Sequence, residues 1–245
     1  MEPEAAPPGD TFVTKGRVRL AEAVRHLVDA TLTAEDASSE KLASAAKKVE
    51  RIATELHGRG ELGSRPSGVR SRQEESHDDY LPRSPLVGVV SPLAPPVEYE
   101  YRDGRLFGRG VFHAAYEGPP GYVHGGWIAL GFDEILGMAN IASGHPGMTG
   151  RLSIRYRRPT PLHRPMEFEG WTDQVDGRRV VTRGTLTVDG SVTAEAEGLF
   201  VVIDLDRAVE YFGERAYERR EAVDPLPRSA RRAHSGIPHE YTFVC

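Results

Sequence analysis

The stretch HGGWIALGFDEILGMANI, residues 124–141, decides the fold. Between Trp127 and Ile141 only Asp133 and Glu134 carry a charge. A helix that is apolar on nearly every side belongs in the interior of a domain, because only there can its whole surface be covered. The remainder of the chain must therefore supply elements that enclose this helix.

Segments rich in β-forming residues flank the helix on both sides. The sequence predicts a hairpin before the helix, with strands at 97–101 and 106–113 joined by Asp103-Gly104. Four more strands are predicted after it, at 150–157, 166–175, 179–188 and 191–203, with hairpin turns at Asp176-Gly177 and Asp189-Gly190. An antiparallel sheet wrapped around one central helix buries one of its faces on that helix. We therefore predict an α+β domain over residues 97–205.

The other parts of the chain have different compositions. Residues 1–16 are rich in proline, alanine and glycine, which is typical of a flexible arm. Helical periodicity over 17–58 gives two apolar stripes and predicts a helical hairpin that extends the domain. Residues 59–96 are polar and broken by proline, as in a linker, and 206–245 form a charged tail.

Composition excludes several classes of function. The 245 residues carry a net charge of −5, which argues against a dedicated nucleic-acid binder. No apolar run approaches the length of a membrane span, and the start of the chain lacks the apolar segment of a secretory signal. Cys245 is the one cysteine, so no disulfide framework can form within the chain. A cytoplasmic location is the default expectation.

The beginning of the apolar helix has the features of a catalytic site. Backbone N–H groups at a helix N-terminus are unpaired and partially positive, and Gly125 and Gly126 let another atom approach them closely. Such a site can polarise a carbonyl and stabilise the oxyanion formed when that carbonyl is attacked. Asp133, farther along the helix, is a carboxylate that is costly to desolvate, which indicates a functional role.

Helix geometry separates these two features. Gly125 and Asp133 are eight positions apart, or about 12 Å along the helix axis. One carbonyl needs its base and its oxyanion donor each within about 3 Å. If both residues act, they must come from different subunits, and a two-fold dimer with antiparallel central helices would form two equivalent sites.

The motif His124-Gly125-Gly126, with Asp133 nine positions after the histidine, resembles the PaaI-type branch of hotdog-fold acyl-CoA thioesterases. The flanking stretches 117–121 (EGPPG) and 155–162 (RYRRPTPL) match that branch too, and the resemblance covers about residues 85–205. It implies a hotdog fold, and a homodimer or a dimer of dimers that acts on acyl-CoA or acyl-carrier-protein thioesters without a cofactor.

The resemblance also implies roles for individual residues. Asp133 would be the general base or the nucleophile, the Gly125 N–H would bind the thioester oxygen, and Thr149 would assist the attacking water. Many members of the branch have an asparagine six residues before the histidine, and this chain has Gly118 there. Glu117, one residue earlier, could orient water or substrate instead.

Each of these residues also has a purely structural interpretation. Asp133 could be a satisfied core carboxylate or an interfacial ion pair, and the two glycines could serve only the turn. The His124 ring could tie down the loop or contact substrate; no second histidine at ligand spacing supports a metal role. We expect Glu134 to point away from Asp133 and to be solvated or interfacial. The basic residues near the end of the first strand after the helix could bind the phosphates of CoA or could be a solvated strand face: Arg155, Arg157 and Arg158.

Three functions remain in competition. The first is thioester hydrolysis through Asp133 and Gly125. The second is a non-catalytic module that binds acyl thioesters with the same dimer fold. The third, hydration of an enoyl thioester, needs an Asp/His pair in a different motif, which this chain lacks.

Overall fold

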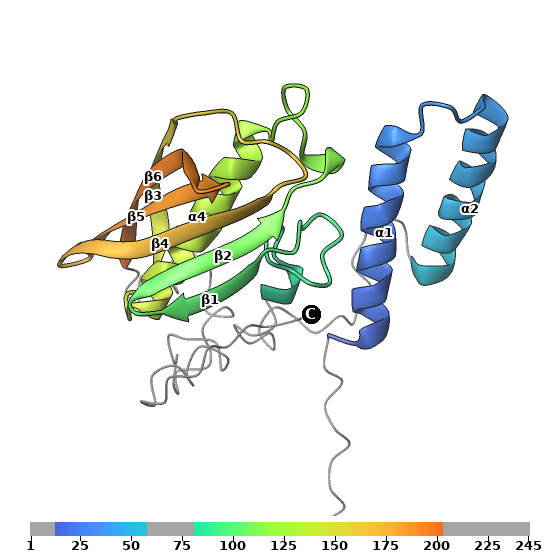
Figure 1. Ribbon diagram of the computed structural model, residues 1–245. Helices are drawn as coiled ribbons and strands as arrows, with labels where there is room; N and C mark the ends of the chain where they lie inside the picture. Colours follow the sequence, from blue (N-terminus) through green and yellow to red (C-terminus); the bar gives the residue numbers. More distant parts are fainter. Residues whose placement is uncertain (1–12, 58–80, 203–245) are drawn as a thin grey trace, which may run out of the picture.

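A six-stranded sheet curves around one long helix, and two further helices precede it in the chain (Figure 1). The computed structural model describes residues 13–57 and 81–202. The helices are α1 (Lys15–Thr33), α2 (Ser39–His57) and α4 (Gly125–Ala142), with short 3-10 turns η2 (Leu81–Arg83) and η3 (Ala114–Tyr116). The strands are β1 (Glu98–Arg102), β2 (Arg105–Val111), β3 (Gly147–Tyr156), β4 (Pro165–Asp176), β5 (Arg179–Val188) and β6 (Ser191–Val202).

All neighbouring strands of the sheet are antiparallel, in the order β1-β2-β4-β5-β6-β3. The three predicted Asp-Gly turns join β1 to β2, β4 to β5 and β5 to β6. The φ angles are positive at both residues of Asp103-Gly104 and of Asp189-Gly190, a conformation that tight hairpins need and that these residues tolerate. The strand order leaves β3 at one edge of the sheet and β1 at the other.

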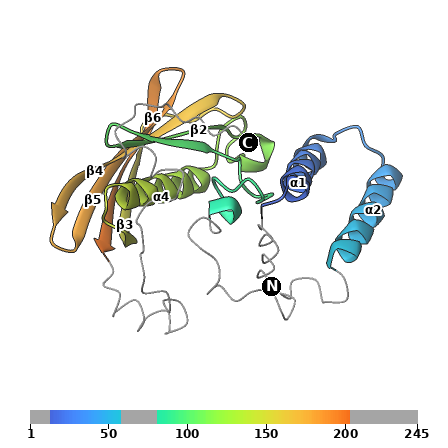
Figure 2. The same cartoon turned by 90° about the horizontal axis from the view of Figure 1, so that it is seen from below.

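The central helix α4 lies against the concave face of the sheet (Figure 2). Phe132 and Phe168 are fully buried and meet edge to face, with ring centroids 5.3 Å apart. A β-carbon at Gly131 would lie 2.3 Å from the Phe168 ring, so no larger residue fits there. Gly170 and Gly184 pair across β4 and β5 directly beneath the same helix. These glycines allow a close approach between helix and sheet.

The segment between η2 and β1 is part of the folded domain, although it lies in the stretch that we expected to be a linker. Leu86 and Val97 belong to the same buried cluster as α4. Ser84 is fully buried, and its hydroxyl oxygen accepts hydrogen bonds from the N–H groups of Leu86 and Val87 at 3.1 and 3.3 Å. The earlier part of the expected linker, the tail at 206–245 and most of the arm at 1–16 lie outside the described residues.

The expected N-terminal helical extension is confirmed as α1 and α2. Helix α1 lies beside η3 and the loop before β1, where Ala21 is buried and the Arg25 guanidinium donates to the Ser91 carbonyl at 2.9 Å. Helix α2 lies beyond α1, on the side of the molecule away from β3 (Figures 1 and 2). None of the helices in residues 13–57 and 81–202 combines the length and the apolar character needed to cross a membrane.

Candidate active site

The helix α4 begins at Gly125, two residues before the apolar run that predicted it, because His124 caps it. The His124 backbone is extended (φ −61°, ψ 132°), and its Nδ1 accepts a hydrogen bond from the Gly126 N–H at 2.9 Å. No residue in the described ranges accepts a hydrogen bond from the Gly125 N–H. This donor is therefore free to bind a carbonyl oxygen or an oxyanion.

Tyr156, at the end of β3, holds the same turn of the helix from the other side. Its hydroxyl donates to the Gly125 carbonyl at 2.8 Å. A β-carbon on Gly125 would lie 3.3 to 3.5 Å from the Tyr156 hydroxyl and ring, so the ring covers the glycine closely. Sequence reasoning missed this residue, because Tyr156 is separated from Gly125 by 31 positions and stands in a run of arginines.

Asp133 is exposed on α4 and is paired with Thr149, the residue for which the resemblance implies a role in assisting water. The Thr149 hydroxyl donates to Asp133 Oδ1 at 2.8 Å. Thr149 lies within β3, which begins at Gly147 and has a register irregularity between Thr149 and Arg151. Bulges of this kind redirect side chains next to functional sites. One edge strand therefore fixes the carboxylate at one end and the helix N-terminus at the other.

A single chain does not bring Gly125 and Asp133 to one carbonyl. Both lie on the same continuous helix, so the separation of about 12 Å expected from their spacing applies. Each chain thus presents a free backbone N–H and an exposed carboxylate at different points on the α4 surface.

Glu117 closes the loop that leads to α4. Its carboxylate accepts a hydrogen bond from the Gly121 N–H at 2.6 Å, within a loop where the Gly118 N–H also donates to the Tyr122 carbonyl at 2.9 Å. A β-carbon at Gly118 would lie 2.7 Å from the His124 α-carbon. An asparagine at this position would therefore require the His124 cap to move.

The three candidate phosphate-binding arginines differ in their environments. Arg157 donates to the Glu195 carboxylate at 2.7 Å, and this hydrogen bond holds the pKa of Glu195 below its usual value. Arg155 and Arg158 are exposed, and no hydrogen bond or ion pair holds either guanidinium within the described residues. Arg155 and Arg158 are thus the two with guanidinium groups available to an anion.

Glu134 points away from Asp133, as expected, and is largely buried instead of solvated; the alternative expectation, that it is interfacial, stays a prediction. Consecutive helical residues point about 100° apart, so Asp133 faces outward while Glu134 points towards the segment that contains Ser84. Burial raises the pKa of the Glu134 carboxyl; the hydrogen bond with Ser84 opposes this shift, and the nearby Asp133 charge adds to it. Glu134 Oε1 is buried without a hydrogen-bond partner in the part of the chain that the structure describes.

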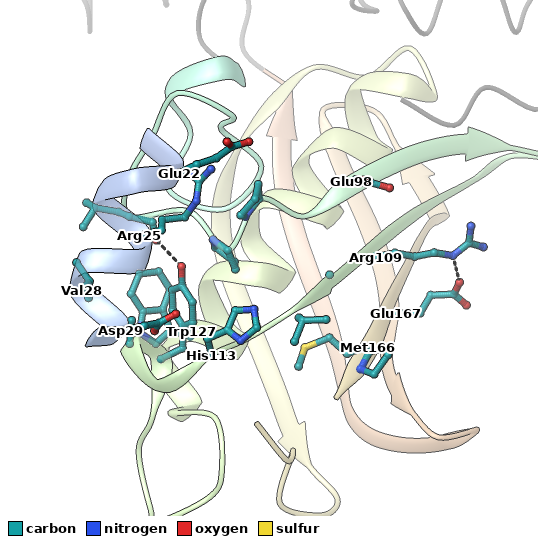
Figure 3. A pocket seen from close by; sticks show the side chains of 18 of the residues that line it. Glu22, Arg25, Val28, Asp29, Glu98, Arg109, His113, Trp127, Met166 and Glu167 are labelled. Carbon is teal, nitrogen blue, oxygen red and sulfur yellow. Dashed lines mark hydrogen bonds and ion pairs between the residues drawn. The ribbon is translucent and has the colours of Figure 1, made fainter. Parts of the chain in front are cut away.

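A groove of about 1070 Å³ lies between α1 and the sheet (Figure 3). Tyr116 and Trp127 line it and meet edge to face, with ring centroids 4.9 Å apart. The Tyr116 hydroxyl donates to the Leu93 carbonyl at 3.2 Å, and burial raises the pKa of Tyr116 to about 12. Neither Gly125 nor Asp133 lines this groove, so the candidate site is a separate place on the single chain.

No group of three or more histidine, cysteine, aspartate or glutamate side chains that could hold a metal ion exists among residues 13–57 and 81–202. The candidate site itself offers a backbone donor, a carboxylate and a hydroxyl.

A family model described as the thioesterase superfamily matches residues 120–195, which include the α4 N-terminus, Asp133 and Thr149. The acyl-coenzyme A thioesterase THEM4 of Rattus norvegicus is 32% identical over 93 residues, which are 37% of this chain and 40% of that protein. The THEM4 of Xenopus laevis is 32% identical over 87 residues, 35% of this chain and 39% of that protein. The chain thus matches about two fifths of the length of these curated relatives.

Among solved structures, one thioesterase superfamily protein is similar over most of both chains. It is 36% identical in sequence, covers 80% of this chain and 93% of its own, and superposes with a TM-score of 0.67. The similarity therefore extends to almost the full length of that relative.

Proposed function

The chain belongs to the thioesterase superfamily, and on this basis we propose that it hydrolyses acyl thioesters, with acyl-CoA as the substrate class. It has the hotdog fold that the sequence predicted. The observation that carries the proposal is the arrangement on α4. The Gly125 N–H at the helix N-terminus is free to bind an oxygen, and the exposed Asp133 carboxylate is held by Thr149.

The working site is formed by two copies of the chain. Gly125 and Asp133 cannot reach one carbonyl from the same helix, so the donor comes from one subunit and the carboxylate from its partner. A two-fold axis that sets two α4 helices antiparallel satisfies this requirement twice and gives two equivalent sites. The free edge of β3 and the exposed side of α4 are the surfaces that such a dimer would join.

In the general-base route, the Asp133 carboxylate takes a proton from water, and the water oxygen attacks the thioester carbonyl. The negative charge that develops on the carbonyl oxygen is stabilised by the Gly125 N–H and the N-terminal end of the helix dipole. Collapse of the tetrahedral intermediate breaks the carbon–sulfur bond and releases the thiol as its thiolate is protonated. In the alternative route, Asp133 attacks the carbonyl itself, the carbon–sulfur bond breaks to release the thiolate, which is protonated, and water hydrolyses the resulting mixed anhydride to the free acid and the Asp133 carboxylate.

Arg155 and Arg158 are the residues proposed to bind the phosphates of CoA, because their guanidinium groups are exposed and make no hydrogen bond in the described chain, although the charge of Arg155 also acts on Glu195. The Arg157 guanidinium is hydrogen-bonded to Glu195 and is therefore less available to bind a phosphate. His124, Gly126 and Glu117 maintain the loop geometry that presents the Gly125 N–H.

A non-catalytic module that binds acyl thioesters is the second candidate. It is favoured by Gly118, which takes the place of an asparagine common in the PaaI-type branch. A binding module would have no need for the hydrogen bond between Thr149 and Asp133. That hydrogen bond occupies one carboxylate oxygen and leaves the other open to a reactant.

Release of free thiol from short, long and aromatic acyl-CoAs, measured beside Asp133→Asn, tests the proposal. We expect turnover by the wild type and a fall of about 100- to 10,000-fold in the variant, because the amide cannot act as a base. A non-hydrolysable acyl-CoA thioether should bind both proteins with similar affinity. Binding without thiol release by the wild type, from acyl-CoA and from an acylated carrier protein alike, would establish the binding module instead.

A further inference from the structure

Helix α2 has an apolar stripe that the described chain leaves about half exposed. Its four large apolar residues retain between 40% and 64% of their exposure: Leu42, Val49, Ile52 and Leu56. Leu20 and Leu27 on α1 are each 40% exposed as well. The two helices lie side by side at the edge of the molecule farthest from β3 (Figures 1 and 2).

An apolar stripe that is only partly covered is costly for a helix of 19 residues. Most helical stability in proteins comes from packing of the apolar face, and a short isolated helix is marginal in water. Positions 42, 49 and 56 repeat every seven residues, and Ala45 and Ile52 fall between them, as in the seam of paired helices. The stripe therefore has the pattern of a helix that pairs with another helix.

The charges beside the stripe select the partner and its direction. Lys41, Lys48 and Glu55 flank one side of the seam, and Ala46 and Ala53 flank the other. When two α2 helices run antiparallel, their charged flanks face each other. If Leu42 packs on the partner's Ile52, then Lys41 lies opposite the partner's Glu55. This pairing occurs twice across a two-fold axis, and the alanine flanks allow close approach.

A parallel pair does not have these contacts. It would place the charged flank of each helix against the alanine flank of the other, so Lys41 and Glu55 would both lack a counter-charge. The antiparallel pair has one unfavourable feature, since Lys48 meets the partner's Lys48 near the axis. Two attractive contacts against one repulsive contact still favour the antiparallel arrangement.

We propose that α2 is an interface with a second copy of this chain, in which two α2 helices pair antiparallel and the two α1 helices complete a four-helix arrangement. This interface is additional to the one that forms the catalytic site, because α2 and β3 lie on opposite sides of the molecule (Figures 1 and 2). The two contacts together join catalytic dimers in pairs.

The molar mass of the full chain in solution tests this interface. Light scattering or sedimentation velocity should give for Val49→Glu/Ile52→Glu half the mass of the wild type, with thiol release per chain retained. Lys47→Glu, on the face of α2 opposite the stripe, is the matched control and should leave the mass unchanged. An equal mass for the wild type and the double variant at every concentration would overturn the proposal.

Charge exchange supplies a second test that does not depend on the apolar residues. Lys41→Glu and Glu55→Lys should each raise the dissociation constant between the larger and smaller assemblies, by about tenfold. The combined Lys41→Glu/Glu55→Lys chain should restore it, because each pair is re-formed with reversed sign. Failure of the combined variant to recover would exclude the antiparallel register. Absence of thiol release from the wild type, together with the expected fall in mass of the double variant, would count against the proposed function and not against this interface.

Discussion

At the scale of single residues, the role proposed for Gly125 can be tested by removing its N–H alone. Gly125→Pro lacks this donor, yet proline is well tolerated at the first position of a helix. The extended backbone of His124 is also the conformation that a following proline requires. We expect turnover to fall by about 100- to 1000-fold, the usual loss for one oxyanion donor.

Gly125→Ala is the matched control for this substitution. It introduces the same β-carbon, 3.3 Å from the Tyr156 hydroxyl, but keeps the N–H. Its turnover should stay within severalfold of the wild type, with circular dichroism showing a folded protein in both variants. Equal losses in the two variants would mean that crowding against Tyr156, and not the missing donor, reduces activity.

The buried Glu134 carboxyl should make the folding stability of the protein depend on pH. Because burial raises its pKa in the folded state, the folded chain binds this proton more tightly than the unfolded chain does. The stabilisation is therefore complete below the unfolded pKa and is lost as the pH rises through the folded pKa. Glu134→Gln does not titrate and should be more stable than the wild type at pH 8, by about 1 kcal/mol.

Urea unfolding of both proteins at pH 8 and near pH 4 measures this difference. The advantage of Glu134→Gln should become small at the acidic pH, where the wild-type carboxyl is mostly protonated in both states. Glu98→Gln, at an exposed position on β1, serves as the control substitution. An advantage of equal size at both pH values would exclude ionisation of Glu134 as its cause.

Candidate site residues with a local sequence signal could be proposed from the sequence, and those that depend on tertiary contacts could not. Gly125 and Asp133 were identified because a glycine pair before an apolar helix and a charge within that helix are visible in one segment. Tyr156 joins the site through a contact between distant segments. Glu134 points away from Asp133 as helix rotation predicts, but its burial depends on the segment that contains Ser84, which lies far from it in the sequence.

At the scale of elements, β3 connects the two halves of the candidate site, and Thr149 is its point of contact with Asp133. Thr149→Val removes a hydrogen bond to a charged acceptor, worth about 1.5–3 kcal/mol. We expect kcat to fall by about tenfold or more while KM changes little. Thr149→Ser retains the hydroxyl and should keep most of the wild-type kcat in the same thiol-release assay. An unchanged kcat in Thr149→Val would mean that the hydroxyl has no part in the reaction.

The elements themselves could largely be predicted, and their ends could not. The apolar run predicted α4 and the Asp-Gly pairs predicted the hairpins, since both signals are local. The start of α4 depends on the His124 cap, and the start of β3 on pairing with the end of β6. The folded segment before β1 was not predicted because it is rich in prolines and polar residues. Its residue Leu86 becomes buried only through contact with the rest of the domain.

At the scale of the whole molecule, the proposed function requires two chains at each site. Asp133→Asn disables the carboxylate of one chain and leaves its Gly125 intact, while Gly125→Pro does the reverse. In a mixed dimer of these two variants, one of the two sites receives an intact donor and an intact carboxylate. The other site receives both substitutions.

Mixing the two inactive variants under conditions of subunit exchange should therefore restore turnover. With equal amounts and random pairing, half of the dimers are mixed and each has one intact site, so activity should reach about a quarter of the wild type. Each variant taken alone through the same exchange procedure should stay inactive, which shows that the procedure itself does not restore turnover. A mixture no more active than its components, with exchange verified by mass spectrometry of the intact dimers, would place Gly125 and Asp133 in different functions. Recovery would show that the α4 helices of two chains share each site, as their spacing along one helix demands.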